Sequence, residues 1–162
     1  MGKEREHEAM SAEQRLQELG LELPAPPKPV ANYVPAVQVG DLLFLSGVLP
    51  SRDGQLIMTG KLGQGITIEQ GVEAARVAVL NGLSIVKHEI GSLDRVKRIV
   101  KVVGYIASAP GFTEHPQVLN GASDLLVSLF GDTGRHARVA VGAAELPRYA
   151  PVEIELIVQI TA

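Results

Sequence analysis

Two charged residues within apolar segments near the C-terminus are the ones best suited to chemistry. Arg138 opens the run Arg-Val-Ala-Val-Gly-Ala-Ala-Glu-Leu-Pro, and Glu153 lies within the apolar segment 152–158. A charge in such surroundings is costly unless something pairs with it. The guanidinium of Arg138 suits a carboxylate, which it can grip with two parallel hydrogen bonds. The pattern points to a small acidic ligand, and an internal salt bridge is the alternative.

The composition narrows the classes of protein to consider. The chain has 162 residues, 46% hydrophobic and 4% aromatic, with a net charge of −3. This predicts one domain with an aliphatic core and argues against a nucleic-acid partner, which usually meets a basic face. The absence of cysteine excludes disulfides and thiolate metal sites. No apolar run is long enough for a membrane span or a signal peptide, which favours a cytoplasmic protein with no membrane partner.

The histidines carry no recognisable metal or nucleophile motif. None of the four has metal-ligand spacing, and no Ser-His-Asp set or phosphate-binding loop is visible. We expect no metal and no cofactor, with the histidines at the surface or at helix ends: His7, His88, His115 and His136.

The chain divides into an extension, 1–30, and a single domain, 31–162. The extension begins with a charged stretch expected to be disordered. A short helix over 11–20 follows, with Ser11 and Gln14 at capping-box spacing and Gly20 at its end. Prolines then make 23–29 an extended arm. We expect residues up to about Pro29 to be dispensable for the site.

The domain shows five main strands and two long helices. A hairpin is predicted over 37–45, and the glycine-rich segment 50–66 is predicted to be mostly loop with a brief strand near 56–58. Helices are predicted over 67–90 and 113–130, and strands over 96–107, 137–144 and 152–160. The order β-β-α-β-α-β-β indicates an α+β two-layer sandwich, a mixed sheet with both helices on one face. The other face is half apolar in the last strand, which predicts a homo-oligomer.

With these elements in place, the chain resembles the Rid (YjgF) family of reactive-intermediate imine deaminases, from about 33 to 159. The late signature of that family is an arginine, a small residue and valine, then Leu-Pro and Glu-Ile-Glu. The early signature is a tyrosine before the first strand and Ser-Gly after the second. The residues that carry the resemblance are Tyr33, Ser46, Gly47, Asn120, Arg138, Ala140, Val141, Leu146, Pro147, Glu153, Ile154 and Glu155.

The resemblance implies a chorismate-mutase-like fold and a homotrimer with the site between subunits. It implies that Arg138 binds the carboxylate of a 2-imino acid and that Glu153 holds the attacking water. The pocket would be shaped by Tyr33, Ser46, Gly47 and Asn120, and by the backbone of Ala140. Read without the resemblance, Tyr33, Ser46 and Asn120 are a strand-start residue, a turn residue and a surface residue.

The resemblance leaves three functions open. The first is hydrolytic deamination of 2-imino acids to 2-keto acids and ammonia. The second is a non-catalytic trimer that binds small carboxylates such as 2-keto acids, and the third is a ribonuclease, which the net acidity disfavours. The chain departs from the family pattern at Val48, at Val139 and in the longer loop 50–67, which bears on substrate identity.

Overall fold

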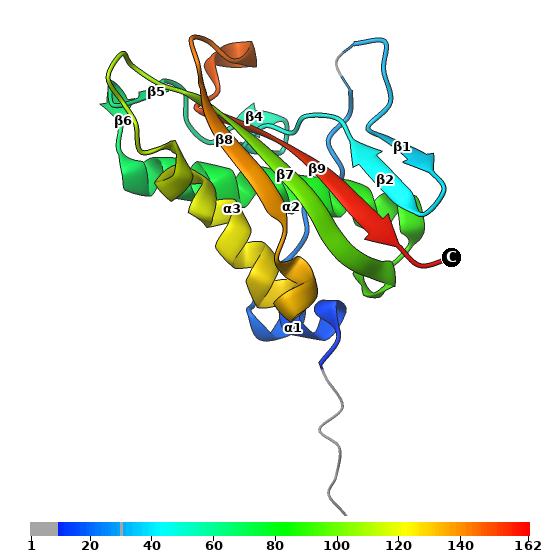
Figure 1. Cartoon of the computed structure of the whole chain (residues 1–162). Helices are drawn as coiled ribbons and strands as arrows, with labels where there is room; N and C mark the ends of the chain where they lie inside the picture. The colour runs from blue at the N-terminus through cyan, green and yellow to red at the C-terminus, as the bar shows by residue number, and fades with distance from the viewer. Residues whose placement is uncertain (1–9, 30) are drawn as a thin grey trace, which may run out of the picture.

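A computed structural model describes residues 10–29 and 31–162, so the charged start that was predicted to be disordered lies outside the described residues. Five strands form one sheet in the order β1-β2-β9-β7-β8, and two long helices cover one of its faces (Figure 1). The strands are β1 (Ala36–Val39), β2 (Leu42–Leu45), β7 (Val96–Ala107), β8 (Ala137–Ala143) and β9 (Val152–Ile160). The predicted α+β two-layer sandwich is confirmed.

The two long helices begin and end where local chemistry requires. Helix α2 (Ile68–Ile90) starts at Thr67 with a complete capping box to Gln70. It ends at Gly91, whose φ of 89° lies in the left-handed region that glycine adopts at little cost. Helix α3 (His115–Phe130) has a proline in its first turn and ends at Gly131. Both helices bury an apolar stripe against the sheet.

Strand pairing makes the sheet mixed, as predicted. β7 runs parallel to β8 and antiparallel to β9, and β9 runs antiparallel to β2. Alternate residues of β9, from Val152 to Ile160, are buried under the helices. Their neighbours Glu153, Glu155 and Ile157 point to the uncovered side of the sheet, which we call the open face.

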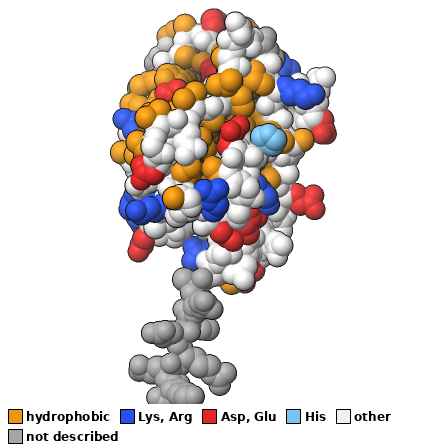
Figure 2. Space-filling view, turned by 90° about the vertical axis from the view of Figure 1, so that its right-hand side faces the viewer, with side chains coloured by type: hydrophobic (Ala, Val, Ile, Leu, Met, Phe, Trp, Pro, Cys, Tyr) orange, Lys and Arg blue, Asp and Glu red, His pale blue; other side chains and the backbone are white. Residues whose placement is uncertain are grey.

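In a single chain, several apolar side chains on the open face are exposed. In the register of β1 and β2, Val37 lies opposite Phe44, which in turn lies opposite Ile157 of β9. Val37 and Phe44 are exposed, and so are Val139 and Val141 on β8. Hydrophobic side chains also gather on the side of the molecule that carries β1 and β2 (Figure 2).

The segment 50–66 is more structured than predicted. It holds two short ribbons, one of β3 (Ser51–Arg52) with β4 (Gln55–Leu56) and one of β5 (Lys61–Leu62) with β6 (Gly65–Ile66). The brief strand predicted near 56–58 therefore begins and ends earlier, because its partner residues in β3 set the register.

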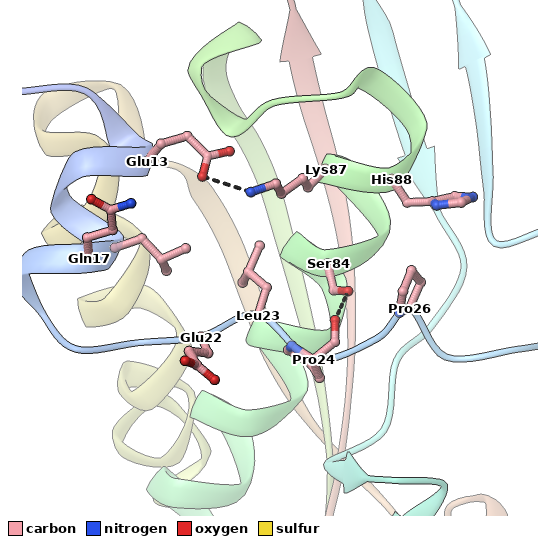
Figure 3. Close-up of a pocket in the computed structure, with 10 residues that line it drawn as sticks. Glu13, Gln17, Glu22, Leu23, Pro24, Pro26, Ser84, Lys87 and His88 are labelled. Atoms are coloured by element: carbon pink, nitrogen blue, oxygen red, sulfur yellow. Dashed lines mark hydrogen bonds and ion pairs between the residues drawn. The ribbon is translucent and has the colours of Figure 1, made fainter.

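The extension is built onto the helices rather than lying apart. Helix α1 (Ala12–Glu18) has the predicted Ser11 capping box and buries Leu16 in the core. Glu13 pairs with Lys87 of α2 at 3.0 Å, and the arm then follows α2, where the Ser84 hydroxyl donates to the carbonyl of Pro24 (Figure 3). Within the described ranges, none of the helices combines the length and hydrophobicity that a membrane crossing requires.

Candidate functional site

The seven residues implied by the family resemblance fall into two clusters on one chain. The cavity cluster, which consists of Tyr33, Ser46, Gly47 and Glu153, lines a cavity of about 330 Å³. The edge cluster consists of Asn120, Arg138 and Ala140, on α3 and on the edge strand β8. Each cluster holds one of the two charged residues with which the sequence analysis began.

Backbone pairing positions Glu153 in the cavity cluster. Val48 and Ile154 exchange two backbone hydrogen bonds of 2.8 and 3.0 Å, which places Gly47 directly against Glu153. A Cβ at Gly47 would overlap Oε1 of Glu153 and lie 3.0 Å from its Cδ. A larger residue at this position would push the carboxylate away, so the Ser-Gly pair does more than end β2. The Ser46 hydroxyl donates to the carbonyl of Val34 at 2.7 Å, which holds the entry to β1 beside the cavity.

The carboxyl of Glu153 is more basic than an ordinary glutamate. Burial raises the pKa of Glu153, and the negative charge of Glu155 two residues along raises it further. Glu155 lies on the same open face and accepts a hydrogen bond of 3.2 Å from the Tyr105 hydroxyl. A raised pKa brings a carboxylate nearer to the range in which it is an effective general base.

Three contacts with α3 position Arg138 in the edge cluster. Its guanidinium donates to Oδ1 of Asn120 at 2.9 Å, to Oγ of Ser123 at 3.1 Å and to the carbonyl of Pro116 at 3.2 Å. Asn120 is therefore not an isolated surface residue, because its amide oxygen orients Arg138. These acceptors are neutral, so the positive charge of Arg138 remains available to an anion.

His136 supports Arg138 through Ser123. Nε2 of His136 lies 2.8 Å from the Ser123 hydroxyl, and Nδ1 lies 2.6 Å from the carbonyl of Gly134. Burial lowers the pKa of His136, and the charge of Arg138 lowers it further. A neutral imidazole with its proton on Nδ1 satisfies both contacts, since Ser123 then donates to Nε2 and accepts from Arg138. His136 was predicted to lie at the surface or at a helix end; it follows the short helix 131–134 and is half-buried in this network.

Arg138 and Glu153 cannot serve one ligand from the same chain. Arg138 pairs in register with Val102 on β7 and reaches α3, so it lies on the helix-covered side. Glu153 pairs with Tyr105 and points to the open face. The alternative of an internal salt bridge between the two residues is therefore wrong. The two clusters therefore lie on different parts of the surface.

The edge strand β8 offers its backbone as well as its side chains. β8 pairs with β7 alone in the described chain, so the outer N–H and C=O groups around Ala140 face outward. An unpaired strand edge of this length is normally covered by another chain or blocked. Within the described ranges, no group of three or more His, Asp or Glu side chains could hold a metal ion.

Five residues that contact these clusters were not predicted from the sequence. Ser123 and His136 support Arg138, and spacing could have indicated both, since Ser123 follows Asn120 by one helical turn and His136 lies two residues before Arg138, just outside β8. Pro27 and Pro29 of the arm and Arg148 line the cavity of Glu153. The two prolines belong to an arm without regular secondary structure, and Arg148 lies in an irregular turn with a positive φ, so hydrophobic periodicity does not indicate which way these residues face.

Comparison with known proteins identifies the family. The model of the family described as "YjgF/chorismate mutase-like, putative endoribonuclease" matches residues 13–158. The chain belongs to the Rid/YjgF family. It is 48% identical over 146 residues to Protein TCP17 of Trypanosoma cruzi, covering 90% of this chain and 91% of that protein.

Two further relatives connect the family to a named activity and a solved fold. The chain is 32% identical over 137 residues to the 2-iminobutanoate/2-iminopropanoate deaminase of Dermatophagoides farinae, covering 85% of this chain and 92% of that protein. A crystal structure of a "putative endoribonuclease" from Shewanella oneidensis superimposes with a TM-score of 0.90 at 36% identity, covering 93% of this chain and 100% of that one. The family and fold inferred from the residues are thus confirmed.

Proposed function

We propose that this Rid-family protein hydrolyses 2-imino acids to 2-keto acids and ammonia. The observation that carries the proposal is the division of an anion-binding arginine and a basic carboxylate between two complementary halves of the surface. The similarity to a 2-iminobutanoate/2-iminopropanoate deaminase supports it. The reaction adds water across the C=N bond of the imine and releases ammonia from the resulting carbinolamine.

Arg138 binds the carboxylate of the imino acid. Asn120, Ser123 and Pro116 fix the plane of its guanidinium before the ligand arrives. A preorganised guanidinium loses little freedom on binding, and its two parallel N–H groups match the two carboxylate oxygens. The ligand carboxylate thereby sets the position of the imine carbon.

Glu153 takes a proton from the attacking water. The imine carbon is already electrophilic, and protonation of its nitrogen increases this. The water oxygen forms a bond to that carbon while its proton passes to the carboxylate of Glu153. The same group then returns the proton to the nitrogen. The C–N bond breaks with ammonia as the leaving group while the hydroxyl oxygen forms the C=O bond of the keto acid and gives up its proton to water. This sequence needs no cofactor, because no electrons leave the substrate.

A ring of subunits brings the two halves together. The edge cluster lies along β8 at one edge of the sheet, and β1 forms the other edge (Figure 1). Different patches that meet head to tail generate closed rings, whereas a twofold dimer joins identical patches. The exposed apolar residues of the open face, among them Phe44 and Val139, supply the surface for such contacts. We propose a homotrimer in which each site combines one subunit's Glu153 with a neighbour's Arg138.

The experiment that tests the proposal measures imine hydrolysis and ligand binding on the same proteins. Imino acids are generated in the cuvette by an amino acid oxidase, and 2-oxobutanoate is titrated as a stable ligand. We expect the wild type to accelerate ammonia release and to bind 2-oxobutanoate. Arg138→Ala should lose both, while Glu153→Gln should retain binding and lose hydrolysis.

The same measurements decide between this proposal and a non-catalytic carboxylate binder. A binder would hold 2-oxobutanoate through Arg138 but leave imine decay at its spontaneous rate, and Glu153→Gln would change nothing. The raised pKa of the half-buried Glu153 supports the enzyme, since perturbed carboxyl pKa values cluster at catalytic sites.

A further inference from the structure

The N-terminal arm forms part of the cavity that contains Glu153. Pro27 and Pro29 line this cavity together with Val48, Ile85 and Pro147. Residues up to about Pro29 were predicted to be dispensable for the site, yet Pro27 and Pro29 line the cavity that contains Glu153. Part of the cavity wall therefore comes from a segment that belongs neither to the sheet nor to the two long helices.

Two sets of contacts with α2 and its C-terminal end hold the chain that leads into the arm. Glu13 of α1 accepts a hydrogen bond of 2.9 Å from the backbone N–H of Leu93 and pairs with Lys87 of α2. Further along, Ser84 of α2 donates to the carbonyl of Pro24 (Figure 3). These contacts direct the chain along α2, and the residues that follow Pro24 reach the cavity, where Pro27 and Pro29 form part of the lining.

Proline gives the arm a stiff and apolar surface. Each ring fixes φ near −65° and removes a backbone donor, so Pro27 and Pro29 offer the cavity no N–H group. Val48, Ile85 and Pro147 continue this apolar lining. The charged groups in the lining are Glu153, Lys28 and Arg148, and the guanidinium of Arg148 already donates to the carbonyl of Gly54 at 3.0 Å.

From this lining we infer that the arm selects 2-imino acids with apolar side chains longer than that of 2-iminobutanoate, and holds those side chains against Pro27 and Pro29. The inference rests on the proposed function for the reaction, but the binding preference applies equally to 2-keto acids.

The size of the cavity supports a longer side chain. A four-carbon imino acid has about seven heavy atoms, which fill about 200 Å³ if each takes the ~30 Å³ of a water molecule in the liquid. The cavity of about 330 Å³ then leaves room for about four more heavy atoms. A branched six-carbon ligand such as 4-methyl-2-oxopentanoate fits this space.

The test compares ligands of increasing length on two proline variants of the full chain. The double variant Pro27→Gly/Pro29→Gly loosens the cavity wall. The matched control is Pro26→Gly, because Pro26 lies on the same arm but lines the neighbouring hollow beside His88 (Figure 3). Affinity is measured by calorimetry for pyruvate, 2-oxobutanoate, 4-methyl-2-oxopentanoate and 2-oxoglutarate, and hydrolysis is measured for the corresponding imines.

We expect the wild type to bind 4-methyl-2-oxopentanoate more tightly than pyruvate. The double variant should lose about tenfold in affinity for the longer ligand and less than twofold for pyruvate, because removing contact with one or two methylene groups changes affinity by about 10-fold or more. Pro26→Gly should retain the wild-type profile.

Two results would overturn the inference. One is an unchanged length profile in the double variant, which would show that the arm does not contact the side chain. The other is a preference for 2-oxoglutarate that Lys28→Ala abolishes, which would assign the cavity to dicarboxylates. Failure of the proposed hydrolysis is distinguishable from both, because it would leave the keto-acid affinities intact while no imine is turned over.

Discussion

Replacing Gly47 by alanine should disturb the site much more than the fold. A Cβ at this position would overlap Oε1 of Glu153 and lie 3.0 Å from Cδ and 3.1 Å from Cγ. Carbon atoms in contact prefer about 3.5–4.0 Å, so the carboxylate must retreat by about 1 Å. Overpacking a core typically lowers the free energy of unfolding by ~1–3 kcal/mol. The overlapping atom here is the end of a flexible side chain, so we expect a loss at the low end of this range.

The loss of activity should be much larger than the loss of stability. A reacting group displaced by about 1 Å can cost about 10²-fold in rate. We therefore expect Gly47→Ala to lower kcat/KM for imine hydrolysis by about 10²-fold, to leave 2-oxobutanoate affinity within a few-fold of wild type, and to shift Tm by only about 2–4 °C.

Gly104→Ala is the matched control for this prediction. A Cβ at Gly104 on β7 would lie 2.6 Å from Cδ1 of the fully buried Leu119, so the core and not the site must adjust. This variant should lose more stability than Gly47→Ala and keep more of its activity per folded molecule. Two results would refute the reasoning about Glu153. One is a wild-type kcat/KM in Gly47→Ala, and the other is a loss of activity no larger than the fraction of unfolded protein explains.

Three further predictions follow from the contacts around the two charged residues. Activity that needs the Glu153 carboxylate is lost as pH falls through its raised pKa, so kcat/KM should begin to fall at a pH above the ordinary glutamate range. Glu155→Gln removes a neighbouring negative charge and should move this acid-side fall to lower pH. An unchanged pH profile in Glu155→Gln would contradict the assignment of Glu153. Ser123→Ala removes one neutral contact of Arg138 and should weaken the binding of 2-oxobutanoate about 2–10-fold but leave the binding of its amide analogue unchanged. Equal weakening of the binding of both ligands would indicate a merely structural role for Ser123. RNA binding should be absent at moderate salt, and tight binding lost in a defined point mutant would revive a ribonuclease function.

The fold could be predicted because its signals are local. Capping boxes at Ser11 and Thr67 and a glycine stop at Gly91 marked helix ends that the structure reproduces. The strict alternation of β9 predicted which of its residues the helices bury. The segment 50–66 resisted prediction because its ribbons are only two residues long and depend on the pairing of distant partners.

The sequence predicted which residues belong to the candidate site but not how they lie relative to one another. Alternation fixes the faces within one strand, but the relation between Arg138 and Glu153 depends on the register of β8 and β9 across β7. That register places the two residues on opposite sides of the sheet. The contribution of Pro27 to the cavity likewise depends on the path of the arm along α2, which no local sequence pattern encodes.

The most direct test of the account is complementation between two inactive variants. Arg138→Ala and Glu153→Gln are purified separately, unfolded, mixed in equal amounts and refolded together, and imine hydrolysis is compared with each variant refolded alone. If the two variants assemble at random into head-to-tail rings, about a quarter of the interfaces join an intact Glu153 to an intact Arg138. The account predicts about a quarter of wild-type activity in the mixture, while activity no higher than that of the separate variants would contradict a site shared between subunits.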